Sequence, residues 1–311
     1  MPASVKFAHL GFVKNHDEIP VKYNVIKQNR EQQLPWYVDK YNPILKKECS
    51  IAGENGLSVL LPLTSAEAKE DKSRAEKILQ RTVSSLCNDG IEIFKLPNGF
   101  EKTCITNAFV ADGTHLFPFL LCHALKIWEE STRRSLRRCE AVVVHNTLSQ
   151  TESILNHICD DLNFVTVLDL KGEIDELNFI ADKIFDETGL NVVIRSTNKA
   201  ALRSADIAIQ TSTDDFDTAY KRNALVFDLS GNIKRSRELR TRRQDISVVD
   251  SLKLKYKHTI VDLISFEMAL YAKSRSFRQI VAYGYDADSG EELRRYIKRL
   301  GLGVMGLSST A

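Results

Sequence analysis

From Glu140 onward, short runs of apolar residues alternate with longer stretches in which apolar residues recur every three or four positions. The runs are EAVVVHN, NFVTVLDL, LNVVIRS, ADIAIQTS and NALVFDLSG, with DISVVDS as a weaker sixth. Near-continuous apolar runs are typical of strands buried on both faces, and the stretches between them, such as TESILNHICDDL, have a helical period. The pattern predicts a doubly wound parallel sheet, a Rossmann-like α/β domain over residues 135–257.

The flanking segments also read as strands and helices. LSVLLPLTS, a helix ending at Gly90, and IEIFKL predict a βαβ unit near the N-terminus. After the Rossmann-like domain, KHTIVDLISFEMALYAKSRSF reads as one long apolar helix, followed by a last helix and a short strand. We expect residues 1–134 to form an N-terminal α/β lobe to which residues 258–311 return. A ligand-binding cleft is then expected between the lobes.

Composition limits the class of protein. The chain has 311 residues, of which 43% are hydrophobic and 27% charged, with a formal net charge of +2. This is typical of a soluble globular protein and gives no global field that favours nucleic acid or membrane. The six cysteines form no CxxC pair, which argues against a disulfide framework or a metal site. The longest apolar stretch, LFPFLLCHALKIW, is too short to cross a bilayer, and no signal peptide is evident, so we expect a cytoplasmic protein.

The order of several motifs resembles one known family. FAHLGFVKNHDE, ADGTHLFPFLLCHAL, NALVFDLSGNIKR and YGYDADSGEELRRYIKRLGLGVMGL follow one another as in the aldehyde-forming long-chain acyl-acyl-carrier-protein reductases, and more distantly the C-terminal part of plant alkane-forming wax proteins. The resemblance extends over nearly the whole chain, although no single motif is diagnostic. It implies reduction of an acyl thioester by NADPH, through a cysteine thioester, with an acyl carrier protein as partner.

The phosphate-binding turn departs from that family. A dinucleotide normally sits against glycines at a helix N-terminus, whereas the turn here has none, and Leu148 adds bulk where the diphosphate would lie. A plain capped helix and weak phosphate binding by free N–H groups both remain open. Asp169, at the end of FVTVLD, would hold a ribose hydroxyl and repel a 2′-phosphate, or be an ordinary turn residue. The candidate cofactor-binding residues are Asn146, Thr147, Ser149, Thr151, Asp169 and Arg195.

The acyl site departs from the family as well. If Glu267 matches the family's glutamate, the position of the nucleophilic cysteine is Ile264, which cannot attack a carbonyl. Ser265 is adjacent, but it needs a general base, and His258 is two helical turns away. Ser265 and Glu267 are therefore the only catalytic candidates. Three residues of the turn ADGTH are expected either to line an acyl cleft or to be ordinary helix-start positions: Asp112, Thr114 and His115.

The segment IKRSRELRTRR concentrates positive charge. It is interpreted either as a solvated helix face or as a docking surface for an acidic partner such as an acyl carrier protein. No aromatic residues alternate with the arginines, which makes base stacking, and hence RNA binding, the less favoured interpretation. The candidate docking residues are Lys234, Arg235, Arg237, Arg240, Arg242 and Arg243.

Three hypotheses follow from the sequence. The first is a divergent reductase-like Rossmann protein that has lost hydride transfer, binds NAD(P) weakly or not at all, and acts as a non-catalytic partner of a carrier protein, a paralogous subunit or an apolar acyl ligand. The second is an NAD(P)-dependent oxidoreductase with a rearranged cofactor loop, acting on a fatty acyl or aldehyde substrate without a cysteine intermediate. The third is a basic RNA-binding module.

Overall fold

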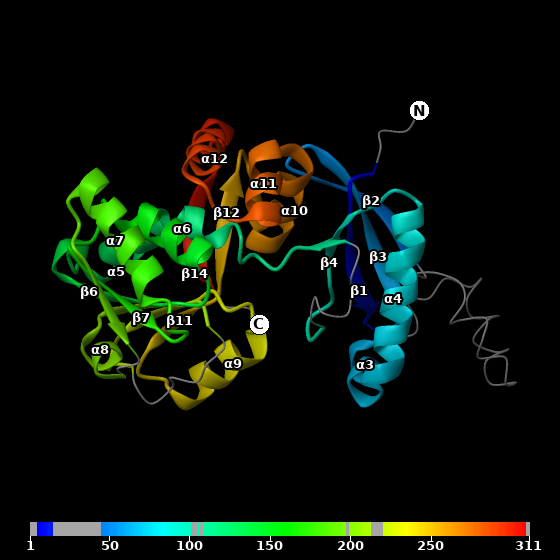
Figure 1. Ribbon diagram of the computed structural model, residues 1–311. Helices are drawn as coiled ribbons and strands as arrows, with labels where there is room; N and C mark the ends of the chain where they lie inside the picture. Colours follow the sequence, from blue (N-terminus) through cyan, green and yellow to red (C-terminus); the bar gives the residue numbers. More distant parts are fainter. Residues whose placement is uncertain are drawn as a thin grey trace, which may run out of the picture. The chain divides into compact units, whose positions relative to one another are not determined.

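The protein folds as two compact units (Figure 1). The computed structural model describes residues 5–14, 45–100, 105, 108–196, 199–212 and 220–308. Unit 1 comprises residues 1–112 and 264–273, and unit 2 comprises residues 113–263 and 274–311. Each unit has its own β-sheet and its own hydrophobic core.

A parallel sheet forms the centre of unit 2. Its strands are β6 (Glu140–Val144), β7 (Phe164–Asp169), β8 (Val192–Ser196), β9 (Ile207–Gln210), β10 (Leu225–Asp228) and β11 (Ser247–Val249). They lie in the order β11-β10-β9-β6-β7-β8, and every pairing is parallel. Counted along the chain from β6, this is the order 3-2-1-4-5-6 of a Rossmann fold, with the order reversing between β6 and β9. The predicted fold class is confirmed.

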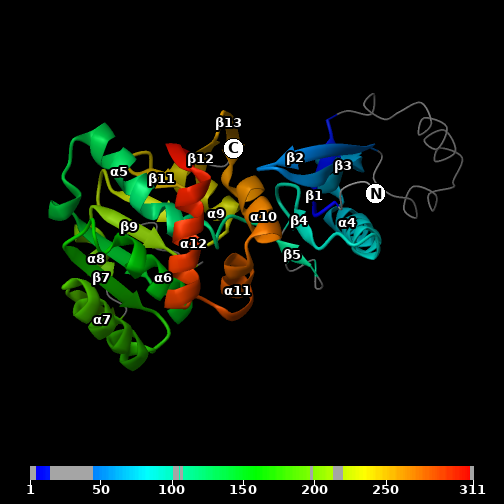
Figure 2. The same ribbon diagram turned by 90° about the horizontal axis from the view of Figure 1, so that it is seen from above.

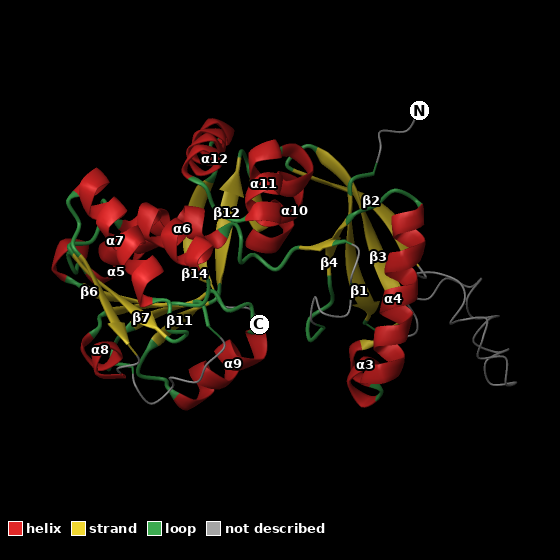
Figure 3. Ribbon diagram, in the orientation of Figure 1, coloured by secondary structure: helices red, strands yellow, loops and turns green. Residues whose placement is uncertain are grey.

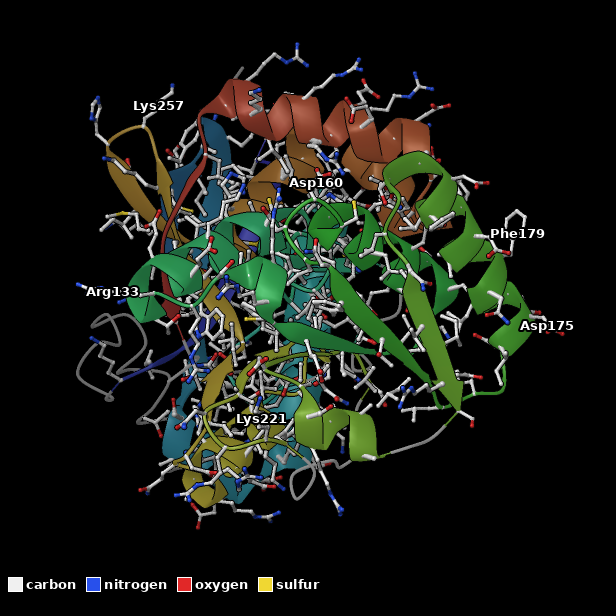
Figure 4. All side chains as sticks on the ribbon, turned by 90° about the vertical axis from the view of Figure 1, so that its left-hand side faces the viewer. Arg133, Asp160, Asp175, Phe179, Lys221 and Lys257 are labelled. Carbon is white, nitrogen blue, oxygen red and sulfur yellow. The ribbon has the colours of Figure 1, made fainter. Side chains whose placement is uncertain are left out.

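Helices cover both faces of this sheet, as the apolar strands require. On one face lie α5 (Leu121–Thr132), α6 (Leu148–Ile158) and α7 (Ile174–Thr188), and on the other lie α8 (Lys199–Ser204) and α9 (Ile233–Arg242) (Figure 3). Gly189 ends α7 in a left-handed conformation with φ of 77°. The outer side of α7 carries Phe179, which points away from the sheet and is 73% exposed (Figure 4).

A small antiparallel sheet and two helices complete unit 2. Strand β12 (Ser251–Tyr256) lies between β13 (Thr259–Asp262) and β14 (Gly303–Ser308), while α11 (Arg275–Tyr283) packs beside α12 (Ala287–Leu300) (Figure 2). The segment expected to be one long helix is therefore a hairpin followed by two helices. Lys257 turns the hairpin with φ of 55°, and Ser274 breaks the helix and caps α11 through Phe277 N.

The boundaries between units consequently differ from those expected. Residues 113–134 and most of 258–311 belong to the Rossmann unit, and only α10 (Leu263–Lys273) returns to unit 1. The physical reason lies in the pairing of elements: β14 completes the sheet of β12, and α5 packs against β14. A run of apolar residues indicates burial but does not indicate the partner.

Unit 1 is a five-stranded mixed sheet with helices on both faces. Its order is β2-β3-β1-β4-β5, formed by β1 (Phe7–Val13), β2 (Leu45–Ile51), β3 (Glu54–Thr64), β4 (Ile93–Lys95) and β5 (Phe109–Val110). The helices α3 (Ser65–Glu70) and α4 (Lys72–Asn88) connect β3 to β4, and both strands run parallel to β1, as the predicted βαβ unit requires. Met268 of α10 packs on Phe7 and Ile93 of the sheet.

Candidate functional site

Buried polar side chains gather at the carboxyl ends of the unit 2 strands. These residues are His145 after β6, Asp169 of β7, Gln210, Thr211 and Ser212 at the end of β9, and Asp228 of β10, all at most 5% exposed. This edge is where open α/β sheets bind ligands, next to the point where the strand order reverses. Buried polar groups are almost always hydrogen-bonded, so the partners of each side chain show what the edge is built to hold.

His145 occupies the position directly after the first Rossmann strand, where a glycine would allow a ligand to approach. Its ring is fully buried and lies between two partners: Nδ1 is 2.8 Å from Thr151 Oγ1, and Nε2 is 2.7 Å from Glu173 Oε2. The ring thereby ties β6 to the first turn of α6 and to the start of α7. The sequence carries no signal for His145 as a site residue, because its partners at positions 151 and 173 are brought to it only by the fold.

The first turn of α6 is a capped helix start. Thr147 Oγ1 accepts a hydrogen bond from Gln150 N at 3.3 Å, and the hydroxyl of Thr151 is hydrogen-bonded to His145 Nδ1. Ser149 Oγ accepts from the backbone N–H of Tyr285 at 2.5 Å, so the loop between α11 and α12 lies on this turn. Among the described residues, the N–H groups of Leu148 and Ser149 have no partner. The candidates Asn146, Thr147, Ser149 and Thr151 therefore lie together, and their role in phosphate binding stays a prediction.

Asp169 ends β7, the second Rossmann strand. Its Oδ1 accepts hydrogen bonds from Lys171 N at 2.9 Å and Gly172 N at 3.0 Å, while Oδ2 is buried and has no partner among the residues that the structure describes. Gly172 adopts φ of 82°, which suits glycine. On the neighbouring strand β8, Arg195 pairs in register with Leu168 of β7. The Arg195 side chain is exposed. Asp169 and Arg195 are thus brought to the same corner of the sheet.

The opposite half of the edge carries a second polar group around β9 and β10. Gln210 Nε2 donates to Ser212 O at 2.7 Å, and Tyr220 Oη donates to Gln210 Oε1 at 3.2 Å. Arg235, in the first turn of α9, donates through Nη1 to the same Ser212 oxygen at 3.1 Å. Asp228 accepts hydrogen bonds at Oδ1 from Ser230 N and Oγ, and at Oδ2 from Ser236 Oγ.

The catalytic candidates lie in α10 of unit 1. Ser265 and Glu267 are buried, and Ile264 packs in the apolar cluster with Phe7. Lys95, at the end of β4, places Nζ 3.4 Å from Ser265 Oγ, so Ser265 has an amine beside it that its sequence neighbours do not supply. A lysine can activate a serine only when it is neutral; a protonated lysine donates a hydrogen bond instead. The catalytic roles of Ser265 and Glu267 stay predictions.

The candidates for the acyl cleft and for partner docking differ in burial and in the unit to which they belong. Asp112 ends unit 1, whereas Thr114 and His115 begin unit 2, and all three are half-buried. Of the six basic residues at α9, Lys234, Arg237 and Arg242 are exposed, Arg240 and Arg243 are half-buried, and Arg235 is buried. Arg240 and Arg243 are paired with Asp250 and Asp245. Arg235 therefore does not belong to an exposed docking surface, and docking stays a prediction for the other five.

Cysteine chemistry is not favoured in the described chain. Burial raises the pKa of the thiols of Cys49, Cys87, Cys122, Cys139 and Cys159, which keeps them protonated and poorly nucleophilic. Cys104 lies outside the described residues. Among those that are described, no group of three or more His, Cys, Asp or Glu side chains could hold a metal ion, and no helix is long and apolar enough to cross a membrane.

Comparison with known proteins gives only distant likenesses. No protein-family model matches the chain, and no curated protein matches it. Among solved structures, a dipicolinate synthase chain from Bacillus halodurans is 12% identical with a TM-score of 0.38, covering 96% of this chain and 98% of that one. L-tryptophan dehydrogenase from Nostoc punctiforme is 11% identical with a TM-score of 0.36, covering 95% and 80%. Shikimate 5-dehydrogenase from Listeria monocytogenes, solved with shikimate and NAD, is 8% identical with a TM-score of 0.35, covering 93% and 96%.

These scores are too low to carry an argument, so the fold assignment rests on the strand order of unit 2. The three proteins just named do not include an acyl-acyl-carrier-protein reductase. That resemblance therefore depends on the sequence motifs alone and stays a prediction.

Proposed function

We propose that unit 2 binds a nicotinamide dinucleotide and that the protein is an NAD(H)-dependent oxidoreductase. The observation that carries this proposal is Asp169 at the end of the second Rossmann strand. Two backbone N–H groups fix its carboxylate, and within the described residues Oδ2 is left buried without a partner. A buried acceptor without a partner is destabilising, and a ribose hydroxyl that donates to it would remove that penalty. An acid at this position is the group with which Rossmann domains hold the adenosine ribose of NAD.

The same carboxylate favours NAD(H) over NADP(H). A 2′-phosphate would place like charge beside a carboxylate that is only 2% exposed, where water screens repulsion weakly. Arg195 is close in register but its side chain is exposed, so it offsets little of this repulsion. We expect NADH to bind at least tenfold more tightly than NADPH, a difference of about 1.4 kcal/mol.

The diphosphate would be held less closely than in a glycine-rich loop. The N–H groups of Leu148 and Ser149 at the start of α6, which have no partner among the described residues, can donate hydrogen bonds to an anion, and the helix dipole adds to the attraction. The Leu148 side chain and the hydrogen bond from Tyr285 N to Ser149 Oγ both lie at this turn. We therefore expect NADH to bind with modest affinity and Leu148→Gly to increase that affinity.

Fluorescence titration with NADH and NADPH tests this function. Wild type should bind NADH with a Kd in the micromolar range, about −8 kcal/mol. Asp169→Asn should weaken NADH by roughly 10-fold to 100-fold, because a charge-assisted hydrogen bond contributes about 1.5–3 kcal/mol. Asp228→Asn is the matched control, since Asp228 also ends a buried strand but its carboxylate oxygens are satisfied by Ser230 and Ser236. Equal affinity in wild type and Asp169→Asn would refute the ribose contact.

A second candidate is the non-catalytic protein that the sequence suggested. The contact of the α11–α12 loop with Ser149 favours it, because Tyr285 N already donates a hydrogen bond to the Ser149 hydroxyl, which lies next to the expected position of the diphosphate. If neither nucleotide binds, this candidate replaces the first. The substrate class follows from the sequence resemblance alone, which implies a fatty acyl or aldehyde compound. Reduction of long-chain aldehydes by NADH, followed at 340 nm, tests that part.

A further inference from the structure

Arg235 is a buried cation whose hydrogen-bonding capacity is mostly unused. It lies in the first turn of α9 and is 9% exposed. Nη1 donates to Ser212 O at 3.1 Å, but Nε and Nη2 are buried and have no partner in the described part of the chain. A guanidinium in this surrounding is destabilised by its lost hydration unless its N–H groups are satisfied. Among the described residues, neither of these nitrogens has an acceptor within hydrogen-bond distance.

The neighbouring acceptors are already occupied. Ser212 O accepts from Gln210 Nε2 as well as from Arg235, which uses both of its lone pairs. The carboxylate of Asp228 has Oδ1 3.8 Å from Arg235 Nη1, too far for a hydrogen bond. Its oxygens accept from Ser230 and Ser236 instead. Asp228 therefore balances the charge of Arg235 without satisfying its remaining N–H groups.

The unused nitrogens form one geometric unit. Nε–H and one N–H of Nη2 point in parallel from the same edge of the planar guanidinium, and this pair matches the two oxygens of a carboxylate. The pair lies beside the ends of β9 and β10, at the edge of the sheet where Rossmann domains receive ligands. We propose that Arg235 binds the carboxylate of a small organic acid through Nε and Nη2.

Charge favours a carboxylate over a phosphate. With Asp228 only 3.8 Å from Arg235, the pair is close to neutral before a ligand arrives. A singly charged carboxylate adds one negative charge to this group, whereas a phosphate adds up to two, and repulsion by Asp228 grows with that charge. The site does not depend on the proposed nucleotide function, because Asp169 lies on β7, on the other side of β6 in the sheet.

The test observes Arg235 directly and without nucleotide. Arginine Nε–H resonances of the full chain are recorded by ¹H–¹⁵N spectroscopy, and the Arg235 signal is assigned by its absence from Arg235→Lys. Acetate, pyruvate, succinate and benzoate are then added singly, up to about 20 mM, well above a Kd of about 1 mM. We expect at least one of them to shift the Arg235 signal to saturation, while phosphate and sulfate do not.

Variants separate the paired N–H groups from the charge. Arg235→Lys keeps the positive charge but loses the parallel pair of N–H groups, so the affinity for a carboxylate, measured by calorimetry, should fall at least tenfold. Arg240→Lys is the matched control, because Arg240 lies on the same helix and already donates to Asp250 Oδ2 at 2.9 Å; its affinity should equal wild type. If Arg235→Lys does not fold, triple-resonance assignment of the wild-type signal still decides. The proposal is overturned if no carboxylate shifts that signal, if only phosphate or sulfate does, or if Arg235→Lys binds as tightly as wild type.

Discussion

Lowering the pH should destabilise unit 2 in part through one buried histidine. His157 of α6 is 6% exposed and packs edge-on against Phe119, with ring centroids 4.5 Å apart. Its Nδ1 donates to Ser153 O at 2.5 Å. Burial lowers the pKa of His157 from 6.5 to about 4, the hydrogen bond to Ser153 opposes this shift, and the charge of Arg294 adds to it. The folded state therefore strongly prefers the neutral ring.

The sign and size of the effect follow from that shift. Between pH 6.5 and pH 4 the unfolded chain binds a proton at His157 that the folded chain does not, so the free energy of unfolding falls as the pH falls through this window. Each pKa unit corresponds to about 1.4 kcal/mol, and the whole shift therefore amounts to about 3 kcal/mol. Above pH 6.5 the histidine contributes no pH dependence, because it is neutral in both states.

The assay compares wild type with His157→Gln, which cannot titrate, in urea unfolding at several pH values between 7.5 and 4. The sequence has two tryptophans, so in a Trp36→Phe background the buried Trp128 of α5 reports on unit 2 alone. Carboxylates such as Asp245 and Asp286, whose pKa values are lowered, also destabilise the fold in acid, but they do so equally in both proteins. The difference in unfolding free energy between the two proteins should shift by about 3 kcal/mol across the window. Parallel curves would refute the buried neutral histidine.

Three further outcomes are expected. Burial raises the pKa of Tyr285 to about 12, so stability should fall as the pH rises from 10 towards 12, and Tyr285→Phe should abolish that part of the loss; an absorbance titration at 295 nm in which all tyrosines ionise together near pH 10 would contradict it. Gly56→Ala should destabilise unit 1 by about 1–3 kcal/mol in urea unfolding followed by circular dichroism, because its Cβ would lie 2.1 Å from the Phe7 ring. Gly303→Ala, in unit 2, meets no atom within 4 Å and should be neutral by the same measurement. Thr64→Ala removes the capping box of α3 and should cost about 1 kcal/mol, to be measured by thermal unfolding.

The sequence by itself determined the alternation of strands and helices. Runs such as EAVVVHN and NALVFDLSG contain several consecutive apolar residues because their strands are buried on both faces, and this pattern predicted the parallel doubly wound sheet. It also predicted a capped start for the helix after β6, because capping is local, although it did not place the cap at Thr147, and it singled out Asp169 from its place at a strand end. Such features depend on residues a few positions apart, which a sequence shows directly.

Tertiary structure alone decided which of these residues have partners. Lys95 and Ser265 are 170 positions apart, and Ser149 and Tyr285 are 136 apart, so neither contact has a local signal. The same is true of the domain boundary: the apolar residues of 258–311 indicated burial, while only strand pairing showed that β14 completes the sheet of β12. Arg235 was placed on an exposed basic surface because charge alone suggests solvent. Its burial follows from how the first turn of α9 lies against the ends of β9 and β10, which no spacing along the chain encodes.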